Sequence, residues 1–137
     1  MIQGYNCIAV IHKNKTEWLM CKRKKDPYKG KLNLVGGKIE KNEDHLDAAY
    51  RELCEETGIG RSDITLKRFL TFDYPLDNCY VEVYGGELDR EIEVKGDENT
   101  LVWVRMDTDF FDLDTCAGEG NIGHMLEIMK LHFNIGV

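Results

Sequence analysis

The segment from residue 43 to residue 57 constrains the fold more than any other part of the sequence. Apolar side chains recur in it at positions i, i+3, i+4, i+7 and i+11, the spacing of a helix that packs one face on a core. The residues of this stripe are Leu46, Ala49, Tyr50, Leu53 and Thr57. Asn42 or Asp44 can cap the helix, and Gly58 followed by Ile59 is typical of a helix end. Because such a helix cannot bury its apolar face alone, the rest of the chain must supply a layer on which it packs.

Short apolar segments on both sides of this helix predict the strands of that layer. They cover residues 5–12, 17–22, 32–35, 65–73, 79–84 and 101–105. A last helix is expected to begin near Asn121. Its buried side would carry Ile122, Met125, Leu126, Met129 and Phe133. Strands and helices interleave irregularly, which predicts an α/β fold with a mixed β-sheet sandwiched between α-helices (α/β/α), as a single domain over residues 1–137.

Composition and charge exclude several functions. No apolar run approaches the roughly 20 residues of a membrane span, and the first residues lack a secretion signal, so we expect a cytoplasmic enzyme without a membrane partner. The net charge of −7 disfavours nucleic-acid binding. The five cysteines form no C-x-x-C pair and predict neither a zinc site nor a disulfide framework. Cys7 and Cys54 lie in apolar patterns and are expected to be buried.

The basic residues are unevenly distributed. Residues 22–31 (KRKKDPYKGK), called the basic loop below, contain six of the 18 lysines and arginines. Such a run is usually a solvated surface loop. This one comes just before Gly36 and Gly37, where the backbone can turn sharply and approach a ligand, so we also consider a role facing an anion.

The helix over residues 43–57 has a second, acidic face. At about 100° per residue, Glu52, Glu55 and Glu56 fall within one sector of about 100°. Like charges this close repel each other, and Arg51 neutralises only part of the cluster. A hard divalent cation such as Mg²⁺ or Mn²⁺ would neutralise the rest, since both prefer carboxylate oxygens. The alternative is a solvated acidic face without a bound ion.

The glycine pair and the acidic helix belong to one longer motif. Its fixed positions are Gly37, Glu43, Arg51, Glu52, Leu53, Glu55, Glu56, Gly58 and Ile59. Their spacing follows G-x5-E-x7-R-E-U-x-E-E-x-G-U, where U is an aliphatic residue. This pattern resembles the Nudix box, the signature of the Nudix hydrolase family, over residues 37–59. The strands and the last helix also fit that family, so the resemblance extends over essentially the whole chain.

The resemblance implies a role for each position of the motif. The metal ligands for Mg²⁺ or Mn²⁺ would be Glu52, Glu55, Glu56 and the carbonyl oxygen of Gly37. Arg51 would hold the glutamates in position. Glu43 would brace the loop and the start of the helix, or act only as a favourable first-turn carboxylate. Gly36 and Gly58 would have structural roles in the turn before the helix and at its end.

The implied reaction is hydrolysis of a pyrophosphate linkage in a nucleoside diphosphate derivative. A bound divalent cation lowers the pKa of a coordinated water, which then attacks phosphorus. Glu52 or Glu55 could act as general base. Glu98 resembles a position at which many family members carry such a glutamate, although residues 97–99 are also ordinary turn sequence. Lys38 either contacts phosphate or is simply exposed.

Fewer residues indicate the substrate. Asn33 and Asn121 resemble positions at which MutT-like enzymes bind the base of oxidised guanine nucleotides, and an amide can both donate to and accept from an oxopurine. Asn33 is otherwise a polar strand residue, and Asn121 a helix N-cap. Arg23 resembles an arginine that can reach phosphate. Leu32 and Val35 replace the tryptophan and proline of many members, which argues against stacking of a base at position 32.

The leading hypothesis is therefore a nucleoside triphosphate pyrophosphohydrolase acting on purine or oxidised purine nucleotides. An ADP-ribose or ADP-sugar pyrophosphatase is the alternative, because Pro75, 16 residues after Ile59, resembles a proline of ADP-ribose hydrolases, although it also fits an ordinary turn. A nucleotide-binding regulatory module without catalysis is less consistent with the intact glutamates. Messenger-RNA decapping fits poorly with the acidic charge. The sequence leaves the oligomeric state undecided, with a homodimer as one alternative.

Overall fold

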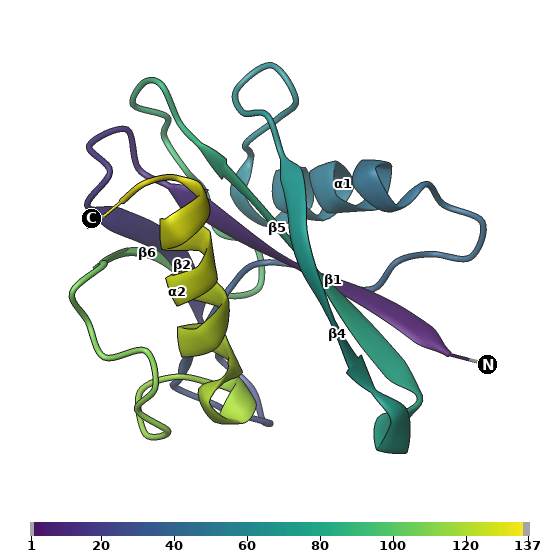
Figure 1. Ribbon diagram of the computed structural model, residues 1–137. Coiled ribbons are helices and arrows are strands. Elements are labelled where there is room, and N and C mark those ends of the chain that lie inside the picture. Colours follow the sequence, from purple (N-terminus) through teal and green to yellow (C-terminus); the bar gives the residue numbers. More distant parts are fainter. Residues whose placement is uncertain (1, 136–137) are drawn as a thin grey trace.

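The computed structural model describes residues 2–135, apart from the side chain of residue 119. A mixed β-sheet forms the middle layer, with α1 (His45–Thr57) on one face and α2 (Asn121–His132) on the other (Figure 1). The predicted α/β/α arrangement is confirmed. Within the described residues, no helix is long and apolar enough to cross a membrane.

Among the described residues, the sheet has six strands. They are β1 (Gln3–Ile11), β2 (Glu17–Lys22), β3 (Leu32–Asn33), β4 (Lys67–Tyr74), β5 (Cys79–Glu87) and β6 (Thr100–Arg105). The order is β3-β2-β1-β5-β4, and β6 pairs with β2. β1 and β5 are parallel and the other pairs antiparallel, so the sheet is mixed as predicted. Each strand predicted from the sequence is present, with bounds shifted by a few residues.

β1 is the strand against which the glycine pair is fixed. It pairs with β5 along its whole length, but with β2 only at residues 10 and 11. Along its N-terminal part, the side of β1 that faces β2 pairs instead with residues 35–39. The N–H of Ile8 donates to the carbonyl of Val35, and the N–H of Asn6 to the carbonyl of Gly37, both at 2.8 Å. The glycine pair is therefore anchored to the middle of the sheet.

α1 starts and stops where local chemistry favours it. Of the two candidate caps, Asp44 is the N-cap, and its carboxylate accepts a hydrogen bond from the N–H of Asp47 at 3.0 Å. Gly58 ends the helix in the left-handed conformation (φ 81°), which glycine adopts without strain. The helix begins at His45, so Glu43 precedes it and is not a first-turn carboxylate.

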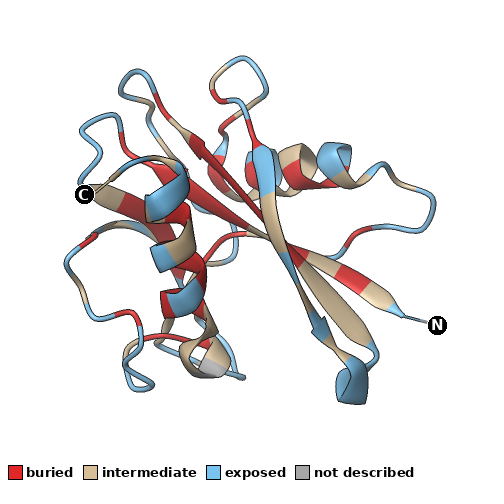
Figure 2. Cartoon of the chain, in the orientation of Figure 1, coloured by how far each residue is buried: buried red, intermediate tan, exposed pale blue. Residues whose placement is uncertain are grey.

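The buried face of α1 differs from the predicted stripe. Leu46 is 39% exposed, whereas Ala48 is fully buried next to Ala49. Cys54, predicted to be buried, is exposed. The helix therefore buries the small side chains of its two alanines, and Leu46 is left partly exposed. Figure 2 shows the buried side of α1 toward the sheet and its exposed outer side.

Two hydrophobic clusters fill the spaces between the sheet and its helices. The cluster under α1 includes Ile8, Leu19, Leu53 and Ile59. The cluster under α2 includes Trp18, Met20, Leu126 and Met129. Phe133 follows α2 and packs partly buried against the second cluster, as predicted. Cys7, also predicted to be buried, is half-buried against the same cluster.

The start of α2 corrects one interpretation of Asn121. The N-cap residue is Gly120, which has no side chain to cap the helix. Asn121 is the first helical residue, and its Nδ2 donates a hydrogen bond to the hydroxyl of Tyr74 at 2.7 Å. The N-cap interpretation of Asn121 is therefore wrong, because the preceding glycine takes the cap position and the amide is used in a tertiary contact.

Candidate active site

Gly36 and Gly37 both pass close to their neighbours, Gly36 against backbone and Gly37 against a side chain. A Cβ at Gly36, where φ is 148°, would lie 2.0 Å from the carbonyl oxygen of Asn6. A Cβ at Gly37 would lie 2.6 Å from the carboxylate of Glu52. The N–H of Gly37 donates to Oδ1 of Asn6 at 3.0 Å, and the N–H of Gly36 donates to Oε2 of Glu56 at 2.6 Å. The loop thus lies between β1 and the acidic face of α1.

Arg51 organises that acidic face. Its Nε and Nη2 donate to the two carboxylate oxygens of Glu43, at 2.7 and 2.9 Å. Its Nη1 donates to Glu52 at 3.0 Å and to Glu55 at 3.3 Å, and Nη2 also reaches the carbonyl of Lys38 at 3.1 Å. The hydrogen bond from Arg51 lowers the pKa of Glu43, and that pair raises the pKa of Arg51. One guanidinium therefore links the loop, the residue before α1 and two of its glutamates.

The three glutamates differ in exposure and ionisation. The side chain of Glu55 is 56% exposed, whereas that of Glu52 is 15% exposed. Burial raises the pKa of Glu56 to about 7, against the lowering effect of the hydrogen bond from Gly36, and the charge of Glu52 raises it further. Burial also raises the pKa of Glu52, although Arg51 opposes this. The charged forms of Glu52 and Glu56 are thus disfavoured, and a nearby cation would relieve that cost.

The donor set matches a hard divalent cation in its chemistry. It consists of the carboxylates of Glu52, Glu55 and Glu56 and the carbonyl of Gly37, all of them oxygen ligands. Among residues 2–135, no three acidic, histidine or cysteine side chains are gathered closely enough to hold an ion. Arg51 binds two of the glutamates and Gly36 the third. Convergence of the three carboxylates on one ion stays a prediction, and it requires these side chains to turn from their present partners.

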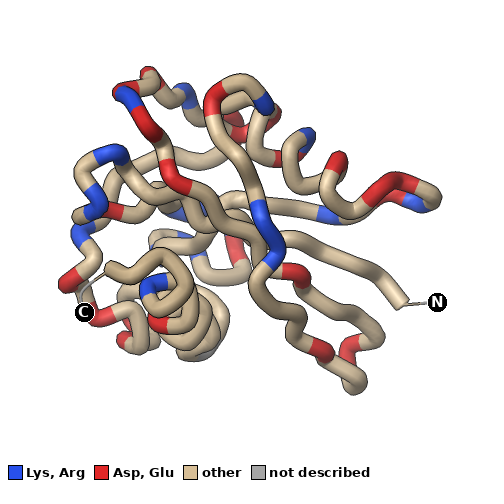
Figure 3. The backbone as a smooth tube through the Cα atoms, turned by 45° about the horizontal axis from the view of Figure 1, so that its top comes forward, with Lys and Arg blue, Asp and Glu red and all other residues tan. Residues whose placement is uncertain are grey.

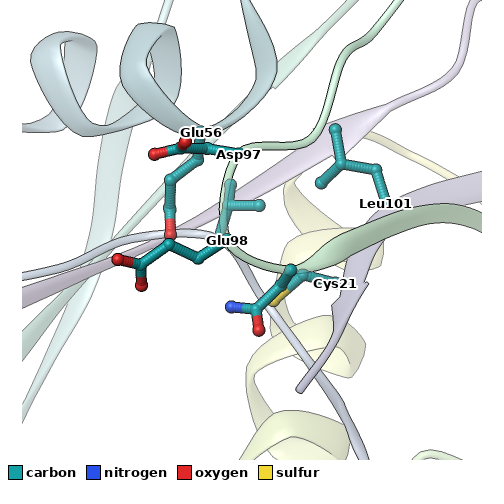
Figure 4. A pocket seen from close by; sticks show the side chains of 7 residues that line it. Cys21, Glu56, Asp97, Glu98 and Leu101 are labelled. Atoms are coloured by element: carbon teal, nitrogen blue, oxygen red, sulfur yellow. The ribbon is translucent and has the colours of Figure 1, made fainter. Parts of the chain in front are cut away.

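A small cavity lies beside Glu56. Its lining comes from β2, α1, the segment after β3, and β6 with the loop before it: Cys21, Val35, Glu56, Asp97, Glu98, Asn99 and Leu101. Figure 4 shows Glu56, Asp97 and Glu98 around this cavity. The charge of Asp97 contributes to the raised pKa of Glu56. The fold therefore brings Glu98, more than 40 positions away in the sequence, next to the acidic face of α1.

A comparison with protein families identifies this arrangement. A family model described as NUDIX domain matches residues 3–115, which include every strand from β1 to β6, the glycine pair and α1. The chain belongs to the Nudix family. Nudix hydrolases are pyrophosphohydrolases and generally use divalent metals. The matched region ends before α2, so Asn121 lies outside it.

Solved Nudix structures share the fold at low sequence identity. A MutT structure, from work on Aliivibrio salmonicida and Vibrio cholerae, is 20% identical, with 96% of this chain and 99% of that chain covered and a TM-score of 0.73. A C. elegans Ap4A hydrolase binary complex is 17% identical, with 97% and 98% covered and a TM-score of 0.77. A bifunctional NMN adenylyltransferase/ADP ribose pyrophosphatase from Francisella tularensis, complexed with AMP and a Mn ion, is 22% identical, with 97% and 42% covered and a TM-score of 0.72.

The two asparagines predicted to contact a base lie on opposite faces of the Nudix sheet. Asn33 pairs with Cys21, which packs in the cluster under α1, while Leu32 and Leu34 pack under α2. Because side chains alternate along a strand, Asn33 points to the α1 side. Asn121 lies on the α2 side. The fold therefore does not bring the two amides together.

A cleft of about 350 Å³ on the α2 side was not predicted from the sequence. Its lining consists of Tyr28, Tyr74, Asp77, Cys79, Val81, Gly118 and Asn121. Tyr28 comes from the basic loop, Tyr74 from the end of β4 and Asn121 from the start of α2. Burial raises the pKa of Tyr74. Two aromatic rings and an amide thus share one cleft only because the chain folds back on itself, which no local pattern predicts.

Arg23 and Lys38, the predicted phosphate contacts, have different surroundings. Nε of Arg23 donates to the carbonyl of Pro27 at 2.7 Å, within the basic loop. Burial raises the pKa of Cys21 to about 11, and Glu56 adds to this while Arg23 opposes it. Cys21, on which both charges act, lines the cavity beside Glu56. The side chain of Lys38 is exposed, and only its carbonyl contacts Arg51.

Proposed function

We propose that this Nudix protein is a divalent-metal-dependent pyrophosphohydrolase that converts a purine or oxidised purine nucleoside triphosphate to the monophosphate and pyrophosphate. The observation that carries the proposal is the set of contacts made by Arg51, which binds Glu43, Glu52 and Glu55 at once beside Gly37. All three candidate metal-binding glutamates are present, which favours catalysis over a purely regulatory module.

Glu52, Glu55 and Glu56 would hold the cation, with the carbonyl oxygen of Gly37 as a further ligand. That carbonyl accepts from Asn6, but a carbonyl oxygen has a second lone pair. When bound, the cation offsets the charge of the phosphates and lowers the pKa of a coordinated water. The protein contributes the side chains that carry these oxygens, and in the absence of the cation Arg51 and the backbone of the glycine pair hold them beside one another.

The attacking water must lose a proton. We assign Glu98 as the general base that accepts this proton. Glu52 and Glu55 are the other candidates, but both already accept hydrogen bonds from Arg51 and are assigned here to the cation. Glu98 is exposed and lines the same cavity as Glu56. It could therefore reach a water held next to the glutamates.

The nucleoside would lie in the cleft of Tyr28, Tyr74 and Asn121. The aromatic rings offer faces on which a base can stack, and the amide of Asn121 can exchange its bond with Tyr74 for one with the base. Asn33 is on the other face of the sheet. Its proposed contact is therefore with the phosphate side of the substrate, near the glutamates, and Arg23 and Lys38 are retained as candidates there.

One observation supports ADP-ribose as a second candidate substrate. Pro75 opens a 3-10 turn, η1 (Pro75–Asp77), and this turn brings Asp77 to the rim of the cleft. A carboxylate at that position could accept hydrogen bonds from the hydroxyls of a second ribose. The proline and the cleft therefore support the same alternative.

A substrate panel tests the proposal. Purified protein with Mg²⁺ would be assayed against dGTP, 8-oxo-dGTP, ADP-ribose and dinucleoside polyphosphates, with product identified by chromatography. We expect the triphosphates to be hydrolysed to monophosphate and pyrophosphate. Turnover of ADP-ribose alone would replace the proposed substrate by the second candidate.

Two substitutions test the site itself. Glu55→Gln and Glu56→Gln each remove a proposed metal ligand and should lower turnover about 100-fold or more. Glu127→Gln on α2, which changes the same charge in an exposed pair with Lys130, is the control and should leave turnover unchanged. Normal turnover in both site variants would mean that the metal site lies elsewhere.

A further inference from the structure

The basic loop holds the strongest unbalanced charge in the chain. It carries six basic residues and one acidic residue, Asp26, a net charge of +5. The other 12 basic residues are outnumbered by 24 acidic residues elsewhere, a net charge of −12. Figure 3 shows acidic residues spread over many segments of the chain. A local charge of this size in an acidic protein creates a field that attracts anions to one place.

The cations of this loop differ from other lysines of the chain in their partners. Within residues 2–135, the side chain of residue 119 apart, no ion pair involves a residue of the basic loop, whereas Lys13, Lys15 and Lys130 each pair with a glutamate. Lys31 donates to the carbonyl of Leu113 instead. The exposed lysines of the loop are Lys22, Lys24, Lys25 and Lys29. Asp97 and Glu98 line the neighbouring cavity, but no described carboxylate pairs with a lysine of the loop, so the charge of its exposed lysines is directed at solvent.

Hydrogen bonds fix the shape of the loop. The N–H of Gly30 donates to the carbonyl of Arg23 at 2.7 Å, the N–H of Arg23 to Lys31 at 3.0 Å, and the N–H of Lys31 to Tyr28 at 2.9 Å. These bonds close a turn whose tip, residues 24–29, carries three of the lysines. A preformed turn loses little conformational entropy when a ligand binds to it.

The same loop borders both parts of the proposed active site. The N–H of Lys24 donates to Oδ1 of Asn99 at 3.1 Å, and Asn99 lines the cavity that contains Glu56. Tyr28 lines the cleft that contains Tyr74. A ligand that extends from the glutamates past this loop would therefore meet the lysines at its tip.

We infer that Lys24, Lys25 and Lys29 form a subsite for the outer phosphates of a linear chain of three or more phosphates; this inference rests on the proposed function. In a diphosphate such as that of ADP-ribose, both phosphates would bind at the glutamates, and no further phosphate would reach the loop. A triphosphate has an additional charged group, and each contact with an exposed ammonium is worth a modest Coulombic gain. The loop thus favours substrates with three or more phosphates over diphosphates, whereas the metal site by itself would not distinguish them.

Binding of inorganic phosphates to metal-free protein tests the subsite without catalysis. Calorimetric titration at low salt would compare tripolyphosphate with pyrophosphate. Lys24→Gln/Lys25→Gln should weaken tripolyphosphate about tenfold and pyrophosphate much less, with a shallower dependence on salt. Lys13→Gln/Lys15→Gln is the matched control, because it removes the same charge at the other end of β2, about 20 Å away. It should change neither affinity.

Two results would overturn the inference. An equal loss of affinity in the two double variants would mean that net charge alone attracts the phosphates. Equal weakening of tripolyphosphate and pyrophosphate by Lys24→Gln/Lys25→Gln would mean that the loop does not select by chain length. Glu55→Gln separates this test from that of the proposed function, since it should abolish turnover and leave metal-free binding of tripolyphosphate intact.

A competition experiment identifies which kind of molecule supplies the chain of phosphates. ATP and a short 5′-triphosphorylated RNA present the same phosphates, and displacement of tripolyphosphate by either supports the inference and identifies the source. The same RNA with a 5′-hydroxyl should not compete. If it competes as well as the triphosphorylated RNA, the loop binds a nucleic-acid backbone and the inference is wrong.

Discussion

Asn6 and Gly37 hold each other through two hydrogen bonds. The N–H of Asn6 donates to the carbonyl of Gly37 at 2.8 Å, and the N–H of Gly37 donates to Oδ1 of Asn6 at 3.0 Å. Asn6 lies in β1 and is only 2% exposed. The proposed carbonyl ligand is therefore fixed by the central strand of the sheet, and its position does not depend on the conformation of the loop alone.

Asn6→Ala should destabilise the protein and weaken the metal site. Loss of Oδ1 leaves the N–H of Gly37 without an acceptor in a partly buried place, which costs about 1–3 kcal/mol of unfolding free energy. Urea unfolding measures that loss, and titration with Mn²⁺ measures the weaker affinity. Asn14→Ala, in the exposed turn after β1, is the control. Wild-type Mn²⁺ affinity in Asn6→Ala would show that this contact does not position the ligand.

Gly37→Ala should impair the site while the fold survives. The added Cβ would meet the carboxylate of Glu52, a flexible side chain that can move aside. Once displaced, Glu52 can no longer hold the cation in place, so we expect Mn²⁺ affinity and turnover to fall about tenfold or more. At Gly60 a Cβ would come no closer than 3.8 Å to Asp63, so Gly60→Ala should have no such effect. Equal effects of the two substitutions would contradict the proposed crowding.

Glu43→Gln should make stability less dependent on acid pH. The hydrogen bond from Arg51 lowers the pKa of Glu43 from its ordinary value of 4.5 in the folded protein. The ionised carboxylate therefore stabilises the fold above pH 4.5, and this contribution is lost as the pH falls through the lower folded pKa. The difference in unfolding free energy between wild type and variant, from urea unfolding, should shrink below that pH. Glu40→Gln, at an exposed position, is the control, and a difference independent of pH would refute the assignment.

Alkylation should modify Cys54 before the other thiols. Cys54 is exposed, whereas Cys21 and Cys116 are buried. Burial raises the pKa of Cys7 to about 12 and that of Cys21 to about 11, so few of these thiols are ionised and reactive at mild pH. Brief treatment with iodoacetamide followed by peptide mass mapping measures the order, with denatured protein as the fully labelled reference. Early labelling of Cys21 in folded protein would contradict the burial.

The local rules of the sequence were sufficient for the elements and the motif. The spacing of apolar residues predicted α1, and Asp44 and Gly58 marked its ends, because caps depend only on residues within one turn. The spacing of the glutamates likewise placed them on one face, since a helix repeats every 3.6 residues. Asn6 was missed, although a polar residue directly before the apolar run of residues 7–11 was a signal that could have revealed it.

Contacts between distant segments were decided only by the tertiary structure. The burial of Ala48 in place of Leu46 depends on how α1 sits on the sheet, and the bond between Asn121 and Tyr74 depends on how α2 meets β4. The separation of Asn33 from Asn121 depends on which face of the sheet each side chain enters. Periodicity specifies which side of an element is apolar, but long-range packing decides what that side meets, and so it alone assembles the cleft.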